Sequence, residues 1–109
     1  MNDSEKLLKE MGQRIVELRK QKGLTQDELS EMASVTSQMI SYAELGKKAI
    51  RPENLCKLSK ALGVSSDYLL TGELIDKDYL LLQDKLQILP TDKIKHIEDI
   101  IDSCIKLTK

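Results

Sequence analysis

The sequence predicts an all-α protein, with five short helices in its first two thirds and a pair of amphipathic helices at its C-terminal end. Three observations support this. Apolar residues recur at spacings of three and four, glycine or proline separates the periodic segments, and two helix starts carry full sets of capping residues. With 109 residues, 40% of them hydrophobic, the chain can form one modest domain and an appendage.

The expected helices follow one another with short connections. The first spans about residues 4–22, with its apolar face at Leu8, Met11, Ile15 and Leu18, and ends at Gly23. The second and third span about 26–33 and 37–45. The fourth opens at Arg51-Pro52 and ends at Gly63, and a fifth, capped by Ser65, ends near Gly72.

The second and third helices have the clearest starting signals. Thr25 is placed to cap the N–H of Glu28, whose carboxylate can bond back to the N–H of Thr25, and Leu24 and Leu29 are spaced as a hydrophobic staple. Thr36 repeats the cap, with Val35 and Ile40 as the second staple. Only three residues separate the two helices. They must therefore cross at a steep angle, which is the geometry of a helix-turn-helix.

These residues resemble the Cro/lambda-repressor class of helix-turn-helix proteins, also called the XRE family. The resemblance runs from about Gly12 to Gly72. It rests on Gly12-Gln13-Arg14-Ile15, Leu18-Arg19, Gly23-Leu24-Thr25-Gln26, Leu29-Ser30, Val35-Thr36, Ile40-Ser41, Glu44-Leu45-Gly46-Lys47, Leu55, Leu58, Ala61-Leu62-Gly63-Val64-Ser65 and Tyr68-Leu69-Leu70. The family usually has glycine at position 34 and alanine at position 30. We expect Ser34 to carry strain in a left-handed turn, and the turn to survive.

Two further helices are expected after Gly72, so we divide the chain into a domain at 1–72 and a segment at 73–109. Pro90 separates the two helices and Thr91 is the expected cap of the second. Their apolar stripes are too large to be covered by a hairpin of their own. We expect the stripes to form a dimer contact, with packing on the chain's own domain as the alternative. The dimerisation residues are Leu82, Leu86, Leu89, Ile94, Ile97 and Ile101.

Composition excludes several classes of protein. No apolar run approaches membrane-spanning length, and residues 1–10 are too charged for a secretory signal. Cys56 and Cys104 lack metal-ligand spacing, which favours reduced thiols in a cytoplasmic protein. His96 stands alone, so no metal and no cofactor are expected. There is no pair of metal ligands and no glycine-rich phosphate loop, and we expect no enzymatic activity.

The net charge of −1 counts against indiscriminate nucleic-acid binding, but the charge is unevenly distributed. Through Gly72 the chain has eleven cationic and ten acidic side chains, a net charge of +1, whereas the remainder has a net charge of −2. This distribution suits a first domain that contacts phosphates and a C-terminal segment that does not.

The third helix is expected to contact base edges of double-stranded DNA. Its outward positions are Ser37, Gln38, Ser41 and Tyr42. Gln38 is the strongest candidate, because a carboxamide can pair with adenine through N6 and N7, and the resemblance implies base contacts at these positions. Ser37 and Ser41 are ambiguous, and Tyr42 could contact a thymine methyl group or a phosphate. Outside this motif, the same residues would be taken as a solvated helix face.

Phosphate contacts are expected on both sides of the third helix. The start of the second helix has free N–H groups and a favourable dipole end, and the resemblance implies that Gln26 contacts the DNA backbone. The complete set of expected phosphate-contacting residues is Thr25, Gln26, Thr36, Lys47, Lys48 and Arg51. A Lys-Lys loop can also serve solubility alone, and Thr25 can be a cap alone. The resemblance further implies a structural ion pair between Arg19 and Glu44.

The sequence therefore predicts a sequence-specific DNA-binding transcriptional regulator, a repressor that occupies a two-fold operator as a homodimer. The alternative is a protein-interaction module, such as an antitoxin or a regulator controlled by a protein partner that binds the C-terminal helices. The operator sequence, the regulated genes and the inducing signal are not encoded in any pattern of the chain.

Overall fold

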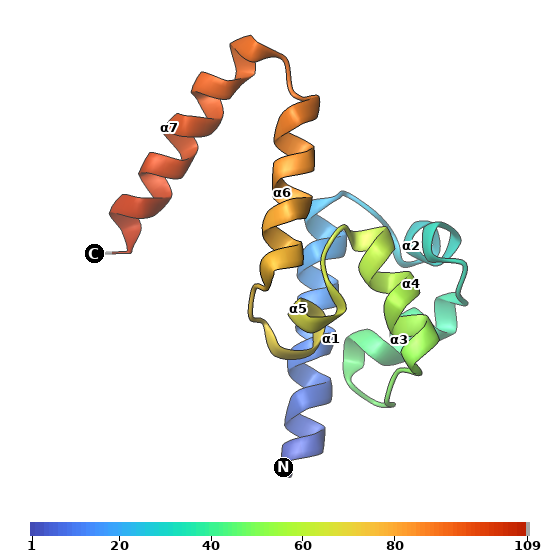
Figure 1. The fold of residues 1–109 in the computed structure, drawn as a ribbon. Helices are drawn as coiled ribbons and strands as arrows, with labels where there is room; N and C mark the ends of the chain where they lie inside the picture. Colours follow the sequence, from blue (N-terminus) through green and yellow to red (C-terminus); the bar gives the residue numbers. More distant parts are fainter. Residues whose placement is uncertain (109) are drawn as a thin grey trace. The chain divides into compact units, whose positions relative to one another are not determined.

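The structure is a computed structural model that describes residues 1–108. These residues form seven α-helices and no β-strand (Figure 1), which confirms the predicted all-α class. The helices are α1 (Asp3–Gln21), α2 (Gln26–Ala33), α3 (Ser37–Leu45), α4 (Pro52–Leu62), α5 (Ser66–Thr71), α6 (Asp76–Ile88) and α7 (Thr91–Leu107). The chain divides into two compact units, of which the first is Met1–Asp78 and the second starts at Tyr79. The first unit thus extends past Gly72 into the first turn of α6.

The core of the first unit is built from the apolar stripes of α1 to α5. Helix α1 packs against α3 and α5, and α2 packs against α3 and α4. The buried hydrophobic residues are Met11, Ile15, Leu29, Ala33, Ile40, Ala43, Leu58, Leu62 and Leu69. All nine are small or aliphatic. Burying a side chain of the size of Leu or Ile contributes about 1.5–3 kcal/mol, so this cluster is the main stabilising term of the unit.

Gly12 allows α1 to pack closely against the end of α3. A Cβ atom at this position would lie 2.5 Å from the carbonyl oxygens of both Ala43 and Glu44, closer than nonbonded atoms can approach. Glycine is therefore required by space here, inside a helix where it costs about 1 kcal/mol relative to alanine. The contact fixes the position of α3 relative to α1.

Asp78 connects the first turn of α6 to the start of α5 within the first unit. Its carboxylate accepts hydrogen bonds from the Ser65 N–H at 3.0 Å, the Ser65 hydroxyl at 2.9 Å and the Ile75 N–H at 2.8 Å. Burial raises the pKa of this carboxyl group, but the three hydrogen bonds and the charge of Lys77 together lower it by more, so its pKa lies below the ordinary value. Asp78 is thus a buried carboxylate that accepts hydrogen bonds at both of its oxygens.

The connection between α6 and α7 differs from the expected one in two details. Helix α6 ends at Ile88, so Leu89 lies beyond it, because a residue that precedes proline disfavours helical backbone. The predicted cap at Thr91 is wrong. Pro90 is the N-cap residue, without a side-chain hydrogen bond, and Thr91 is the first helical residue.

The apolar side chains of α6 and α7 remain largely accessible. Leu82 is 51% exposed and Ile101 is 45% exposed, while Leu86, Ile94 and Ile97 are partly buried. None of the residues of α7, all of which the structure describes, is buried. Within residues 1–108, no helix combines the length and the hydropathy that a membrane crossing requires.

We expect Asp78→Asn to lower the free energy of unfolding at neutral pH by about 1.5–3 kcal/mol, because an amide cannot accept the three hydrogen bonds. The pKa of Asp78 is lowered in the folded protein, so its contribution is complete above the unfolded pKa of about 3.9 and is lost as the pH falls through the folded value. Urea unfolding at a series of pH values should therefore show the two proteins converging in acid. Asp84→Asn, at an exposed position of α6, is the matched control. A difference that persists undiminished in acid would contradict this role.

Candidate nucleic-acid interface

Helices α2 and α3 both start at the caps that the sequence predicts. The Thr25 hydroxyl accepts from the Glu28 N–H at 3.0 Å, and the Glu28 carboxylate accepts from the Thr25 N–H at 3.0 Å, which completes a capping box. The Thr36 hydroxyl accepts from the Met39 N–H at 3.1 Å. Both hydroxyl groups are thus used inside the protein, and their expected phosphate contacts stay predictions.

The turn between α2 and α3 has the left-handed backbone expected at Ser34. Its φ is 58° and its ψ is 45°, and it is the one residue other than glycine with positive φ in the described chain. The Val35 N–H donates to the Ser30 carbonyl at 3.0 Å and closes the turn. The Ser30 side chain is small enough to be buried beside it. The turn therefore forms without the glycine that is usual in the family.

A hydrogen-bonded network joins α1, α2 and α3 through Arg19, Gln26 and Glu44. The Arg19 Nε donates to the Glu44 carboxylate at 2.6 Å and its Nη2 donates at 3.2 Å, while the Gln26 Nε2 donates to the same carboxylate at 2.9 Å. The Arg19 and Glu44 side chains are only 13% and 5% exposed. The hydrogen bond to Glu44 raises the pKa of Arg19, although burial acts against it. The ion pair is thus desolvated and two-pronged, which makes it specific in geometry.

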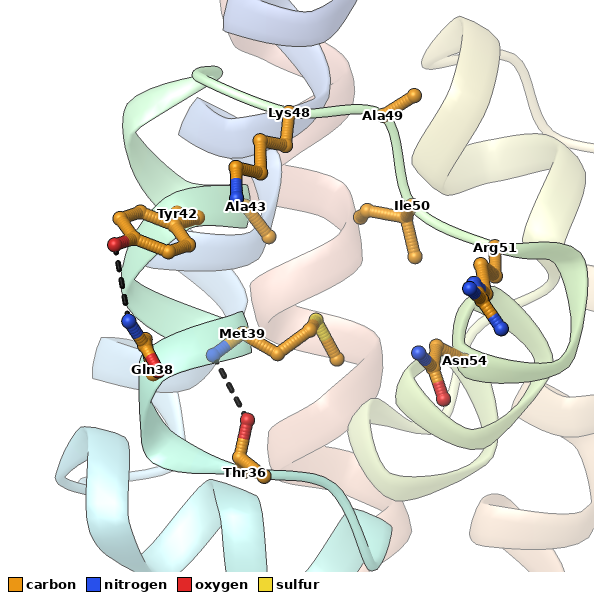
Figure 2. Close-up of a pocket in the computed structure, with 10 residues that line it drawn as sticks. All are labelled: Thr36, Gln38, Met39, Tyr42, Ala43, Lys48, Ala49, Ile50, Arg51 and Asn54. Carbon is orange, nitrogen blue, oxygen red and sulfur yellow. Dashed lines mark hydrogen bonds between the residues drawn. The ribbon is translucent and has the colours of Figure 1, made fainter.

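The exposed face of α3 holds a second, smaller network. The Gln38 Nε2 donates to the Tyr42 hydroxyl at 3.0 Å, and the Lys48 Nζ lies 4.8 Å from the centre of the Tyr42 ring. Figure 2 shows Gln38 and Tyr42 pointing toward each other along α3, with Lys48 extending to the ring from the following loop. The carboxamide of Gln38 is thereby held at the surface in a defined orientation.

Ser37 is less available than expected. Its hydroxyl donates to the Asp27 carboxylate and shares a hydrogen bond with the Ser30 hydroxyl at 3.1 Å. Ser41 is half-buried, whereas Gln38 is exposed. Of the four residues predicted to contact bases, Gln38 and Tyr42 are therefore brought together at the surface and Ser37 is directed toward α2. Asp27 is ten residues from Ser37, and no sequence spacing indicates that the two side chains are partners.

A surface pocket of about 300 Å³ lies between α3, the loop at 46–51 and the start of α4 (Figure 2). Its apolar wall includes Met39 and Ile50, and Asn54 and Arg51 lie at its α4 side. No pattern in the sequence predicts this pocket. The residues that line the pocket come from α3, the following loop and the start of α4, and only the tertiary structure brings them together.

The loop after α3 carries the cationic residues expected beside it. Lys47 and Lys48 are exposed, and Arg51 is the exposed N-cap residue of α4, 4.0 Å from Glu53. At this distance and exposure the Arg51–Glu53 pair contributes little. No group of three or more His, Cys, Asp or Glu residues that could hold a metal ion occurs among residues 1–108.

The fold and this geometry define a helix-turn-helix protein, and a comparison of the sequence with known protein families gives the same class. A family model described as Helix-turn-helix matches residues 15–69. The match covers half of the chain, so the chain belongs to this helix-turn-helix family, as its resemblance to the Cro/lambda-repressor class predicted.

Two relatives are similar to more than half of the chain. The SPbeta prophage-derived HTH-type transcriptional regulator YonR of Bacillus subtilis is 38% identical over 61 residues, which are 56% of this chain and 56% of YonR. Repressor protein C2 of Salmonella phage P22 is 44% identical over 64 residues, which are 59% of this chain and 30% of the repressor. The chain therefore spans about half and less than a third of these relatives.

The chain is also similar to proteins of known structure. The P22 c2 repressor in complex with a synthetic operator has 43% identity and a TM-score of 0.56, and the match covers 58% of this chain and 96% of that chain. A structure of the SinR–SinI protein complex has 27% identity and a TM-score of 0.56, and its match covers 88% of this chain and 98% of that chain. The second match extends past the first unit of this chain.

We expect Glu44→Gln to lower the free energy of unfolding by about 3–5 kcal/mol, because it leaves the buried Arg19 guanidinium without its counter-charge. Glu53→Gln is the matched control, since it removes an exposed pair and should cost less than about 1 kcal/mol. Urea unfolding followed by circular dichroism measures both. Equal effects of the two substitutions would contradict a larger contribution of the buried pair to the stability of the packing between α1 and α3.

Proposed function

We propose that this chain is a sequence-specific DNA-binding transcriptional regulator, and that it represses by occupying a two-fold operator as a homodimer. The observation that carries the proposal is the Gln38–Tyr42 pair on the outward face of α3, with Lys48 of the following loop beside the Tyr42 ring. This face belongs to a helix-turn-helix in which a largely buried ion pair joins α3 to α1. The P22 c2 repressor, 43% identical in its solved domain, binds operator DNA, which supports the same role here. The proposed activity is binding without catalysis, in the cytoplasm.

Base contact is proposed for α3. A helix that enters the major groove presents its N-terminal residues to base edges, and Gln38 is exposed at the second position of α3. Its carboxamide carries both a donor and an acceptor, the combination that adenine complements through N7 and N6. Ser41 and Tyr42 lie on the following turn of the same helix, and Ser37 would have to release Asp27 before it could contact a base.

Phosphate contact is proposed for the two ends of the motif. At the start of α2, the N–H groups and the helix dipole favour a phosphate oxygen. The Gln26 side chain donates to Glu44 through Nε2, and the backbone N–H of Gln26 is the proposed phosphate donor, beside Thr25 and Thr36. Lys47, Lys48 and Arg51 are the cationic contacts proposed on the other side of α3.

The homodimer is proposed to form through α6 and α7. Both helices carry accessible apolar side chains, including Leu82, Ile101 and the partly buried Leu86, Ile94 and Ile97. Leu89, beyond the end of α6, extends the same apolar surface. Leaving such a surface in water is unfavourable at about 25 cal/mol per Å², and a second copy offers the same surface in a two-fold arrangement.

A second function is supported by the comparison with SinR. The match to the SinR–SinI complex extends past the first unit. It supports a regulator in which a protein partner binds the C-terminal helices in place of, or in competition with, a second copy. DNA binding by the first unit is compatible with this control.

We expect Gln38→Ala to weaken binding to the cognate operator by about 1–3 kcal/mol and to leave binding to random DNA nearly unchanged. The operator is first obtained by selecting bound sequences from a random DNA pool, and affinities are then measured by fluorescence anisotropy on selected and random duplexes.

Lys47→Ala is the matched control for this experiment. It removes a cation beside the motif, so it should weaken both kinds of binding alike and reduce the slope of log affinity against log salt by roughly one for each subunit bound. Equal losses by Gln38→Ala on cognate and random DNA would show that Gln38 makes no base contact.

We expect the double substitution of Ile97 and Ile101 by Glu to weaken the dimer by at least tenfold for each buried side chain lost, because each isoleucine contributes about 1.5–3 kcal/mol when buried. Sedimentation velocity of the full chain over a range of concentrations measures the dimer. Ser103→Glu places a charge on the opposite side of α7 and should have no effect. A monomeric wild-type protein at micromolar concentration, or a variant that dimerises as well as the wild type, would contradict the proposed interface.

A further inference from the structure

We propose that Tyr42 is a positioning residue that holds the Gln38 carboxamide in the orientation required for adenine, and that Lys48 holds the Tyr42 ring in place. This inference rests on the proposed function, because it assigns a base to the DNA-contacting face of α3. It gives Tyr42 a role different from the direct base or phosphate contact expected from the sequence.

The geometry of the three side chains supports this assignment. Gln38 and Tyr42 are four residues apart on α3, so they lie on the same face one turn apart, and the Gln38 Nε2 donates to the Tyr42 hydroxyl at 3.0 Å. The Lys48 Nζ lies 4.8 Å from the ring centre, within the range of a cation–π contact. Figure 2 shows the three side chains converging at the outer edge of α3.

The hydrogen bond determines which groups of Gln38 remain for DNA. One amide proton is used by Tyr42, so a second amide proton and Oε1 remain. One donor and one acceptor complement the N7 acceptor and the N6 amino group of adenine. Guanine presents two acceptors, N7 and O6, and would leave Oε1 facing an acceptor. A fixed carboxamide therefore favours adenine more strongly than a freely rotating one.

The restraint also reduces the entropic cost of binding. An exposed glutamine samples several rotamers, and immobilising such a side chain at an interface costs about 0.5–1.5 kcal/mol. Tyr42 is half-buried and has only two side-chain torsions, so it is a stiffer support. Loss of its hydroxyl should therefore reduce the discrimination made by Gln38 about two- to tenfold.

The test is a double-mutant cycle of Gln38→Ala and Tyr42→Phe in the full chain, measured on the selected operator and on duplexes with each base pair substituted in turn. The base pair whose discrimination disappears in Gln38→Ala is the one that Gln38 contacts. We expect Tyr42→Phe to reduce discrimination at that base pair two- to tenfold, and to have no further effect in the Gln38→Ala background. Urea unfolding of Tyr42→Phe, which keeps the ring, should match the wild type.

Lys48→Ala and Lys47→Ala form a matched pair for the second part of the proposal. Both remove one cation from the loop and should lower affinity for random DNA alike, but only Lys48→Ala should also reduce discrimination at the base pair that Gln38 contacts. Equal discrimination by both variants would overturn the role of Lys48.

The remaining outcomes separate this inference from the proposed function. If Tyr42→Phe has the same effect with and without Gln38, Tyr42 contacts DNA by itself and the positioning role is wrong. If Tyr42→Phe leaves discrimination unchanged while the wild type still selects a defined operator, the inference fails and the proposed function stands. If the wild type selects no sequence from the pool, the proposed function fails, and the inference fails with it.

Discussion

The Glu44 carboxylate is the interaction on which the placement of α3 depends. It receives hydrogen bonds from Arg19 on α1 and from Gln26 on α2, and it lies near the end of α3, so a single acidic group joins the three helices. A buried ion pair of this kind adds little net stability compared with apolar packing, but breaking one side of it is costly. Its contribution is therefore geometric. The ion pair and the close approach of α1 to α3 at Gly12 together restrict the position and the orientation of α3 relative to α1.

The fold was predictable from the sequence wherever a local rule decides the outcome. The capping residues Thr25, Thr36 and Ser65 each accept the expected backbone hydrogen bond. Of the staple residues, Leu29 and Ile40 lie inside α2 and α3 and are buried, and Leu24 and Val35 lie one residue before the caps. The Arg19–Glu44 pair was reached through resemblance rather than spacing, because its partners are 25 residues apart. The role of Asp78 was not predictable from the sequence, because a single aspartate in a polar stretch forms no recognisable pattern. Its hydrogen-bond donors, Ser65 and Ile75, are brought to it by the packing of α5 against the start of α6.

The candidate site was predictable at the level of the helix face but not at the level of the individual side chain. Helical periodicity is sufficient to list Ser37, Gln38, Ser41 and Tyr42 as outward-facing. It does not show that the Ser37 hydroxyl is taken by Asp27, or that Gln38 and Tyr42 bond to each other. These choices depend on rotamers, and the rotamers depend on neighbours from α2 and from the loop after α3. A polar helix face thus becomes a small set of oriented groups only after the tertiary structure is known.

The scarcity of cations explains why the proposed function needs two copies of the chain. The first 72 residues have a net charge of only +1, and three exposed cations, Lys47, Lys48 and Arg51, lie on the loop beside α3. DNA affinity rises with the number of phosphates neutralised, so one such unit would bind weakly and lose most of its affinity at physiological salt. Joining two units makes the second contact effectively intramolecular, which raises the overall affinity without any new residue at the interface with DNA. Weak individual units would also keep binding to random DNA low, so the base contacts proposed for Gln38 would account for a larger share of the total. In the proposed dimer, the accessible apolar helices and the modest charge would act together, because association of the chains would control occupancy of the operator.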